Sequence, residues 1–434
     1  MKVRLLPLAA VAAIAMGAQG FAQQAQGDDL DRALADLNSP LTAPLPGTVD
    51  APQSNSVSFS GYARARNTWL NPAGMASNQK AIDVRIVLNV GFEVTPNSRA
   101  FLSFNGAEGW GTINASAPTQ MNQPGANNPT NAADTGSLEQ AWFQADDLVG
   151  DGGTATIGRK FFTVGSGRIV GTDEWDQMPH AYSGIWYANG MDDWNLNLFM
   201  VQDIFFGMAD GGFGNGDIDL YGFSFDYHLK DLPALGDVNL TPYILRMSDR
   251  NTLTAANYKN WYGAALDGNL PVAGMSYDAE LVWARDNAMS TTDSAWAVNL
   301  ALDLEQMIGE MPESLSPTLE LGMASAENSV VINPSYHNSA GLYDLLGRGG
   351  VWGGAADTWQ AHLGITPMEG WDGSIGYIHF DQNNNSGIDG WELDVEVGTE
   401  LSGNVQAWLG WAMVDQNPNS SKDYVVYGQL GLPF

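Results

Sequence analysis

Apolar and polar residues alternate with a period of two along most of the chain after residue 56. In the stretch 82–94, IDVRIVLNVGFEV, apolar side chains occupy every second position, and Asp83 and Arg85 fall between them. Successive side chains of a β-strand point to opposite faces, so this pattern predicts strands with one apolar and one polar face. The chain is therefore expected to be all-β.

Eighteen stretches carry this pattern. They span residues 57–69, 82–94, 99–108, 137–146, 153–161, 181–188, 193–203, 217–228, 237–248, 258–268, 274–285, 293–303, 316–326, 357–366, 372–381, 389–400, 403–414 and 423–434. The first, third, fifth, seventh and thirteenth connections are long, whereas the second, fourth, sixth and sixteenth are tight. This alternation is typical of a closed transmembrane antiparallel β-barrel with short periplasmic turns and long extracellular loops.

A soluble β-sandwich or propeller also contains strands with one apolar face. Two observations favour the membrane barrel: the apolar face continues through strand after strand without an obvious partner sheet, and tryptophans cluster near strand ends, where interfacial girdles lie. These tryptophans are Trp69, Trp110, Trp175, Trp194, Trp261 and Trp391. After the amino terminus, the sequence has no run of 18 apolar residues, so a membrane helix is not expected.

The amino terminus has the pattern of a secretory signal peptide. Lys2 and Arg4 precede an apolar run that is too short to span a bilayer, and small residues follow it. We predict a signal peptide over residues 1–22, a short periplasmic helix and proline-rich linker over 23–56, and an outer-membrane barrel over 57–434. The expected location is the cell outer membrane. The chain contains no cysteine, so disulfides and thiolate chemistry are excluded.

The last strand, DYVVYGQLGLPF, ends on an aromatic residue, Phe434. Counting back from it, the outward positions are Leu432, Leu430, Gly428, Val426 and Tyr424. This strand resembles the signal by which bacterial outer-membrane barrels are recognised by their assembly machinery. Outer-membrane lipid and that machinery are therefore expected partners.

The polar face of the strands is expected to line the lumen, because lipid excludes charged side chains. The charged residues on that face are Arg64, Arg66, Asp83, Arg85, Glu93, Asp226, His228, Asp267, Asp278, Glu280, Glu320, Glu392, Asp394 and Glu396. In a ring of eighteen strands the second lies opposite the eleventh. The arginines would then face Asp278 and Glu280 across the lumen and set up a transverse field. Local pairing, such as Arg64 or Arg85 with Asp83, is the alternative.

Three segments resemble the alginate-export family of outer-membrane barrels. The most specific is 158–175, GRKFFTVGSGRIVGTDEW, which contains two Gly-Arg pairs and a closing tryptophan. The segments YHNSAGLYD at 336–344, with His337, and GWELDVEV at 390–397 are similar to a long loop and a late strand of the family.

The resemblance implies an eighteen-strand barrel whose lumen is constricted by an inward-folded loop and lined by arginines that pass an anionic polymer. By matching position, it implies that Arg159 and Arg168 line the pore. We add the neighbouring Lys160, which stands where the family usually has a glutamine, to the expected substrate path.

The excess of acidic residues bears on which solute the channel can carry. The chain has 49 Asp and Glu against 18 Lys and Arg, whereas a conduit for a polyuronate needs an electropositive path. Acids in or near loops would repel a polyanion: Asp134, Asp173, Glu174, Asp203 and Asp210. We therefore predict a porin for passive diffusion of small hydrophilic solutes through a charged, constricted lumen. An export conduit for an acidic, alginate-like polysaccharide and a closed structural or adhesive barrel are the alternatives.

No enzymatic motif is recognisable. The five histidines are scattered, and neither G-x-S-x-G nor H-E-x-x-H occurs. No cofactor is expected, although the Asp and Asn clusters at 381–389 and 213–219 leave loop Ca²⁺ open beside solvated loops. The expected solute is a small molecule or oligosaccharide, and no nucleic-acid partner is expected.

Overall fold

The structure is a computed structural model. It describes residues 56–71, 79–111, 137–147, 152–172, 179–205, 218–249, 258–272, 274–287, 290–308, 316–328, 330, 356–368, 370–382, 389–401, 404–415 and 422–434. The expected signal peptide and the expected helix and linker before residue 56 lie outside the described residues. So do Asp134, Asp173, Glu174, Asp210 and the segment 336–344.

Eighteen strands are present, and each overlaps one of the predicted stretches. They are β1 (Ser56–Asn71), β2 (Gln79–Thr95), β3 (Ser98–Gly111), β4 (Ser137–Asp146), β5 (Thr154–Lys160), β6 (Ala181–Met191), β7 (Trp194–Phe205), β8 (Ile218–Leu232), β9 (Gly236–Asp249), β10 (Tyr258–Asn269), β11 (Met275–Asp286), β12 (Thr291–Asp303), β13 (Thr318–Ala326), β14 (Ala356–Met368), β15 (Trp371–Gln382), β16 (Asp389–Leu401), β17 (Val405–Asp415) and β18 (Asp423–Pro433).

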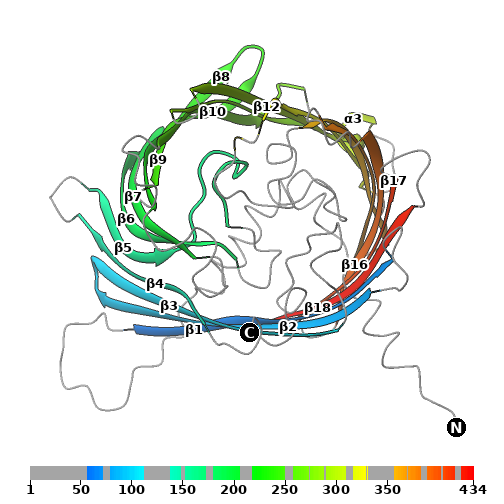
Figure 1. The fold of residues 1–434 in the computed structure, drawn as a ribbon, viewed down its shortest axis with the longest axis horizontal. Coiled ribbons are helices and arrows are strands. Elements are labelled where there is room, and N and C mark those ends of the chain that lie inside the picture. Colours follow the sequence, from blue (N-terminus) through cyan, green and yellow to red (C-terminus); the bar gives the residue numbers. More distant parts are fainter. Residues whose placement is uncertain are drawn as a thin grey trace, which may run out of the picture.

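The strands form one closed antiparallel barrel (Figure 1). Each strand pairs with its neighbours in the sequence, and β1 also pairs with β18. The last residue takes part in the closure, because Gly61 and Phe434 exchange backbone hydrogen bonds of 2.8 and 2.9 Å. The ring of Phe434 packs against Gly61, where an added Cβ would lie 2.7 Å from its Cζ. The carboxyl-terminal residue thus completes the seam.

The outer surface of the barrel is apolar. Phe59, Ile86 and Ile157 are 56%, 51% and 54% exposed, and they lie on the outward face of their strands. Polar residues at the alternate positions, such as Arg85 and Asp83, are buried. An exposed apolar band around a closed sheet is the surface that lipid covers. The predicted faces of β1, β2, β8, β16 and β18 are confirmed.

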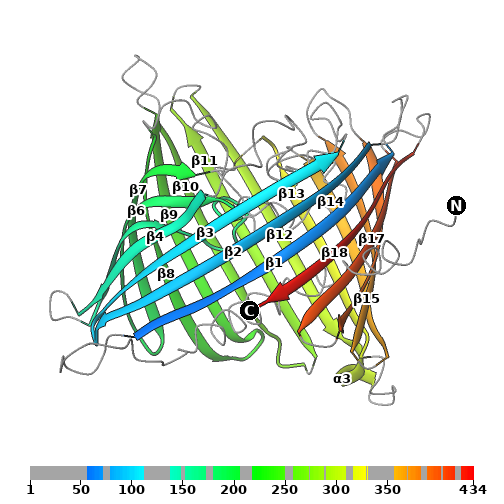
Figure 2. The same cartoon turned by 90° about the horizontal axis from the view of Figure 1, so that it is seen from below.

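The two ends of the barrel, which are seen apart in Figure 2, differ in the length of the connections between strands. At one end, which we call the turn end, β2–β3 and β6–β7 are joined by residues 96–97 and 192–193. At the other, the loop end, the connections include residues 112–136, 161–180 and 327–355. The predicted alternation is therefore confirmed for these connections.

Three details differ from the prediction. The first connection shortens to residues 72–78, because β1 and β2 both extend beyond the predicted bounds. The turn-end connection after β12 contains a short helix, α3 (Leu304–Ile308). Trp261, expected in an outer girdle, is fully buried inside the barrel, and its Nε1 donates to the Val330 carbonyl at 2.5 Å. Among the described residues, no helix is long and apolar enough to cross a membrane.

Candidate functional site: a loop clamped inside the barrel

Residues 161–172, which we call the inner loop, follow β5 and turn into the barrel (Figure 1). Val164 and Val170 form an isolated bridge, and the Val164 N–H donates to the Val170 carbonyl at 3.1 Å. The tip lies between them. Gly165 and Gly167 have φ angles of +58° and +83°, which favour glycine. The tip is therefore a tight turn that the sequence VGSGR can adopt.

Apolar side chains hold the inner loop against the wall. Val164, Ile169 and Val170 are at most 2% exposed. They belong to one cluster with lumen-facing side chains of β6–β9, which are Tyr182, Trp186, Phe199, Val201, Leu220 and Leu245. The Tyr182 hydroxyl also donates to the Gly171 carbonyl at 2.7 Å. The loop is thus packed as a core segment is packed.

The same cluster continues around the loop-end half of the lumen. It includes mostly small side chains: Val282, Ala284, Ala295, Ala297, Ala324, Ala326, Ala356, Ala412, Val414 and Val425. None of these is more than 8% exposed. Small side chains on the wall of an eighteen-strand barrel are covered only where another segment packs on them, since they cannot fill so wide a lumen. We call all these wall positions, from β6 to β18, the apolar socket.

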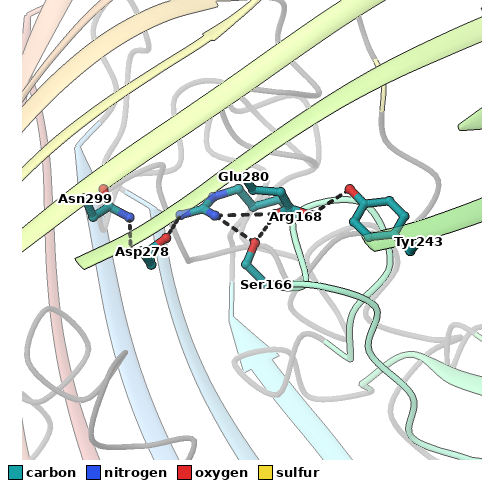
Figure 3. A network of polar contacts seen from close by, with 6 residues as sticks. All are labelled: Ser166, Arg168, Tyr243, Asp278, Glu280 and Asn299. Carbon is teal, nitrogen blue, oxygen red and sulfur yellow. Dashed lines mark hydrogen bonds and ion pairs between the residues drawn. The ribbon is translucent and has the colours of Figure 1, made fainter. Parts of the chain in front are cut away.

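Polar contacts fix the tip of the inner loop to β11 (Figure 3). The Arg168 guanidinium lies 2.8 Å from Asp278 Oδ1 and 3.4 Å from Glu280 Oε2. Arg168 also donates to Ser166 Oγ at 2.7 Å, and the Ser166 hydroxyl donates to Glu280. The Arg168 and Glu280 side chains are 8% and 0% exposed.

Two wall residues complete this network. The Tyr243 hydroxyl on β9 donates to Glu280 Oε1 at 2.7 Å, and the Asn299 amide on β12 donates to Asp278 Oδ2 at 2.7 Å (Figure 3). Both carboxylates therefore have partners on either side. We call the six residues Ser166, Arg168, Tyr243, Asp278, Glu280 and Asn299 the loop clamp. Charge-assisted bonds to buried carboxylates are strong, so the clamp fixes one position of the tip.

The arginines of β1 and β2 form a separate basic wall. Arg64 lies opposite Arg85 in the register, and Arg66 lies opposite Asp83. Their exposed fractions are 7% for Arg64, 2% for Arg66 and 1% for Arg85. Arg85 pairs with Glu139 on β4 at 2.5 Å. Arg66 donates to Gln429 on β18 at 3.0 Å, so Arg66 and Arg85 both bond to other strands of the wall.

Carboxylates occupy two further parts of the lumen. On β16, Glu392, Asp394 and Glu396 are at most 5% exposed, and Glu396 accepts a hydrogen bond of 2.9 Å from Tyr427. On β13, Glu320 lies opposite His362.

The turn-end half of the lumen is polar on β7–β13. Asp226 accepts hydrogen bonds from Asn195, Asn197 and Thr241 at 3.3, 3.0 and 2.9 Å. Asp267 accepts one from Asn239 at 2.9 Å. We call Asp226, Asp267 and Glu320, with the amide partners of the first two, the acid–amide strip. Asp267 and Asn239 are exposed, so this part of the lumen is open to water.

The sequence model for alginate export matches residues 73–335, which is more than half of the chain. The chain belongs to the alginate export family. No protein of curated function gives a significant match. The resemblance read from the segment 158–175 is therefore confirmed.

Solved structures share the architecture of this family member. Pseudomonas aeruginosa OccK11 (OpdR) has 15% identity and a TM-score of 0.55, covering 87% of this chain and 96% of its own. Pseudomonas aeruginosa OpdO has 14% identity and a TM-score of 0.59, covering 87% and 97%. A structure of Pseudomonas aeruginosa OpdK with vanillate has 15% identity and a TM-score of 0.57, covering 87% and 98%. These likenesses show the fold.

The family resemblance assigned Arg159 and Arg168 to the pore, and the structure places these two arginines on different sides of the wall. Arg168 is inside the barrel, as expected, but it pairs with the carboxylates of β11 and does not join the basic wall. Arg159, expected in the pore, lies opposite Ser183, on the face that carries the outward Ile157 and Ile185. It pairs there with Asp203 at 3.2 Å. Lys160 instead faces inward, with Nζ 4.9 Å from the Trp186 ring centroid.

The predicted transverse field is corrected by the same contacts. Asp278 and Glu280 do not face the basic wall across an open lumen, because the inner loop brings Arg168 to them. Local pairing holds Arg85, whose described ion-pair partner is Glu139 on β4. Sequence reasoning missed Glu139, Ser166, Tyr243 and Asn299. A register shift between Ser103 and Phe104 displaces the pairing around Glu139, so strict alternation gives no signal there.

Proposed function

We propose that the chain is an outer-membrane channel for passive diffusion of small hydrophilic solutes. The observation that carries this proposal is a closed ring of strands with an apolar outer band and a charged lumen into which the inner loop folds. The outer band seats the barrel in lipid, and the lumen offers a polar route through it. The fold shared with OccK11 and OpdO supports the same conclusion.

The charges favour neutral, zwitterionic or cationic solutes. The acid–amide strip gives the turn-end half a negative surface that is open to water, and Asp226 and Asp267 are held in place by amide donors. The arginines of the basic wall are buried and bond to wall residues such as Glu139. Rings of carboxylates favour cations in narrow pores. Vanillate, named with OpdK, is an anion, so the two lumens need not pass the same solutes.

The alginate export family supports a second function, the export of an acidic polysaccharide. The basic wall is the feature that favours it. The neutralisation of Arg168 by Asp278 and Glu280 argues against it, because this arginine then has little charge left for a polyanion. A closed structural or adhesive barrel is the third candidate.

Conductance distinguishes the three candidates. The purified full-length protein would be inserted into planar bilayers, and conductance and reversal potential would be measured under a KCl gradient. Stepwise, cation-preferring conductance is the expected result. An anion-selective channel blocked by a polyuronate would support export instead, and the absence of steps would support the closed barrel.

A matched pair of variants tests the assignment of the solute route. Asp267→Asn removes an exposed carboxylate of the acid–amide strip and should lower cation selectivity. Glu93→Gln removes one that hydrogen-bonds Ser56 at the end of β2 and should change selectivity less. Equal effects of the two variants would contradict a route along the strip.

The proposal also includes two expected absences, those of catalysis and of a cofactor. We expect no enzymatic activity. His228 contacts Asn239, His362 lies opposite Glu320, and His379 packs against Trp359 on the outer face. We expect no bound cofactor. Within the described part of the chain, no group of three His, Asp or Glu residues is placed to hold a metal ion. Most of the segments 213–219 and 381–389, considered for loop Ca²⁺, lie outside it.

A further inference from the structure

We propose that the inner loop is a gate for the loop-end half of the lumen and that the loop clamp holds this gate closed. The proposal rests on the channel function above and adds a regulated state to it. Arg168, Asp278 and Glu280 would then be positioning residues for the loop and not contacts for the solute.

The first support is that the loop-end half is packed. Wall residues of the apolar socket are at most 8% exposed, and the inner-loop residues Val164, Ile169 and Val170 lie in the same cluster. A water-filled pore is lined by polar side chains, because apolar walls favour dewetting. An apolar socket is therefore a seat for an inserted segment. In the state described, the inner loop occupies part of this seat, and Val330, which accepts a hydrogen bond from Trp261, belongs to the same cluster.

The second support is where the polar contacts of the tip converge. Ser166 and Arg168 both bond to Glu280, and Arg168 also bonds to Asp278. These two carboxylates lie on one strand, β11, two positions apart. One small region of the wall thus fixes the tip. A contact set this local can be made and lost as a unit, which a gate requires.

The third support is the fit of the tip to the wall. A Cβ at Gly165 would lie 2.6 Å from Glu280 Oε1, 3.1 Å from the Tyr243 ring and 3.4 Å from Ala265 Cβ. The backbone therefore approaches the wall as closely as glycine allows. This approach places Ser166 and Arg168 within bonding distance of Glu280.

Release of the loop would change charge as well as width. With Arg168 withdrawn, Asp278 and Glu280 would face the lumen beside Asp267, which is already exposed. The open state should therefore be wider and more cation-selective than the closed state. A purely structural ion pair would not couple these two properties.

The test compares three acid-to-amide variants in planar bilayers: Glu280→Gln, Asp278→Asn and the control Asp146→Asn. Asp146 is also a hydrogen-bonded carboxylate, but it lies at the turn end of β4, where Gln144 and Thr154 donate to it. Folding of each variant is checked by its heat-modifiable migration on electrophoresis. Tyr243→Phe, which removes one hydroxyl, serves if a charge variant does not fold.

Wild type and Asp146→Asn should be closed for most of the recording. Loss of one charged member of the clamp should raise the ratio of open to closed time on the order of 100-fold. Equal open times in all variants would overturn the gate while leaving the channel intact. No conductance in any variant would overturn the channel function and the gate with it.

A thiol reporter gives a second reading, because the chain has no native cysteine. Ala265 lies opposite Glu280 on β10, and a Cβ at Gly165 would lie 3.4 Å from the Ala265 Cβ. Ala265→Cys should react more slowly with a membrane-impermeant thiol reagent in the wild-type background than in the Glu280→Gln background. Protection that is unchanged in both backgrounds would also overturn the gate.

Discussion

Two buried arginines of the lumen, Arg85 in the basic wall and Arg168 in the loop clamp, are held in different ways. Arg85 is carried by a strand, and its partner Glu139 lies two strands away in the same wall. Arg168 is carried by a loop, and its partners Asp278 and Glu280 lie on β11, far from β5 in the ring. The first pair connects parts of the wall, whereas the second connects the wall to a segment that can leave it.

The difference teaches that equal burial does not mean an equal role. A strand residue cannot leave its place without breaking the sheet, so its ion pair adds to the stability of the barrel. A loop residue can leave while the sheet stays intact, so its ion pair sets the population of one loop position. Four substitutions separate these effects, and they follow from the largest expected effect to the smallest.

Arg85→Met should lower the stability of the whole barrel. It leaves Glu139, whose side chain is 2% exposed, without its ion-pair partner. Removing one member of such a pair costs about 3–5 kcal/mol, because the remaining charge stays buried. Urea unfolding of the refolded barrel in detergent measures the loss. A midpoint equal to that of wild type would show that the pair does not hold the wall.

Arg168→Met should leave that unfolding midpoint near the wild-type value and act on the loop instead. The inner loop can withdraw, and water can then reach Asp278 and Glu280, so about 3 kcal/mol is lost from loop closure and little from the sheet. Bilayer recordings should show longer open times and a reversal potential shifted toward cations. A large fall in the midpoint, as for Arg85→Met, would erase the distinction between the two arginines.

Gly165→Ala should weaken the clamp by a smaller amount. The φ of +58° costs an alanine about 1–2 kcal/mol, and the added Cβ would lie 2.6 Å from Glu280 Oε1. Gly370→Ala is the matched control, because its φ is +77° and a Cβ there would meet nothing within 4 Å. Open times should lengthen only for Gly165→Ala. The same lengthening in both would assign the effect to backbone strain in general.

Lys230→Met should have the smallest effect. Lys230 pairs with Asp193 at the turn end, and both side chains are about half exposed. The hydrogen bond from Lys230 lowers the pKa of Asp193. Any stabilisation of the folded barrel by this ion pair is therefore fully present above about pH 4, the ordinary pKa of an Asp carboxyl. It is lost as the pH falls through the lowered pKa of Asp193. Unfolding midpoints at pH 7 and pH 3 should barely differ between variant and wild type.

The sequence by itself determined the strands and the face of most lumen residues. Alternation is local, and lipid penalises each charge separately, so the inward positions of Arg64, Arg85, Asp278 and Glu392 follow from counting. The outward face of the last strand follows in the same way. Family resemblance added the inward-folded loop, which no periodicity could indicate.

Only the tertiary structure decided which charges meet. A loop has no period that fixes its path, so the pairing of Arg168 with Asp278 and Glu280 could not be read from spacing. A register shift placed Glu139 beside Arg85, and Arg159 lies on the outward face of β5 with Ile157, where the family resemblance did not place it. Alternation fixes the face of a side chain. Its partner depends on barrel closure, which brings distant strands and the inner loop together.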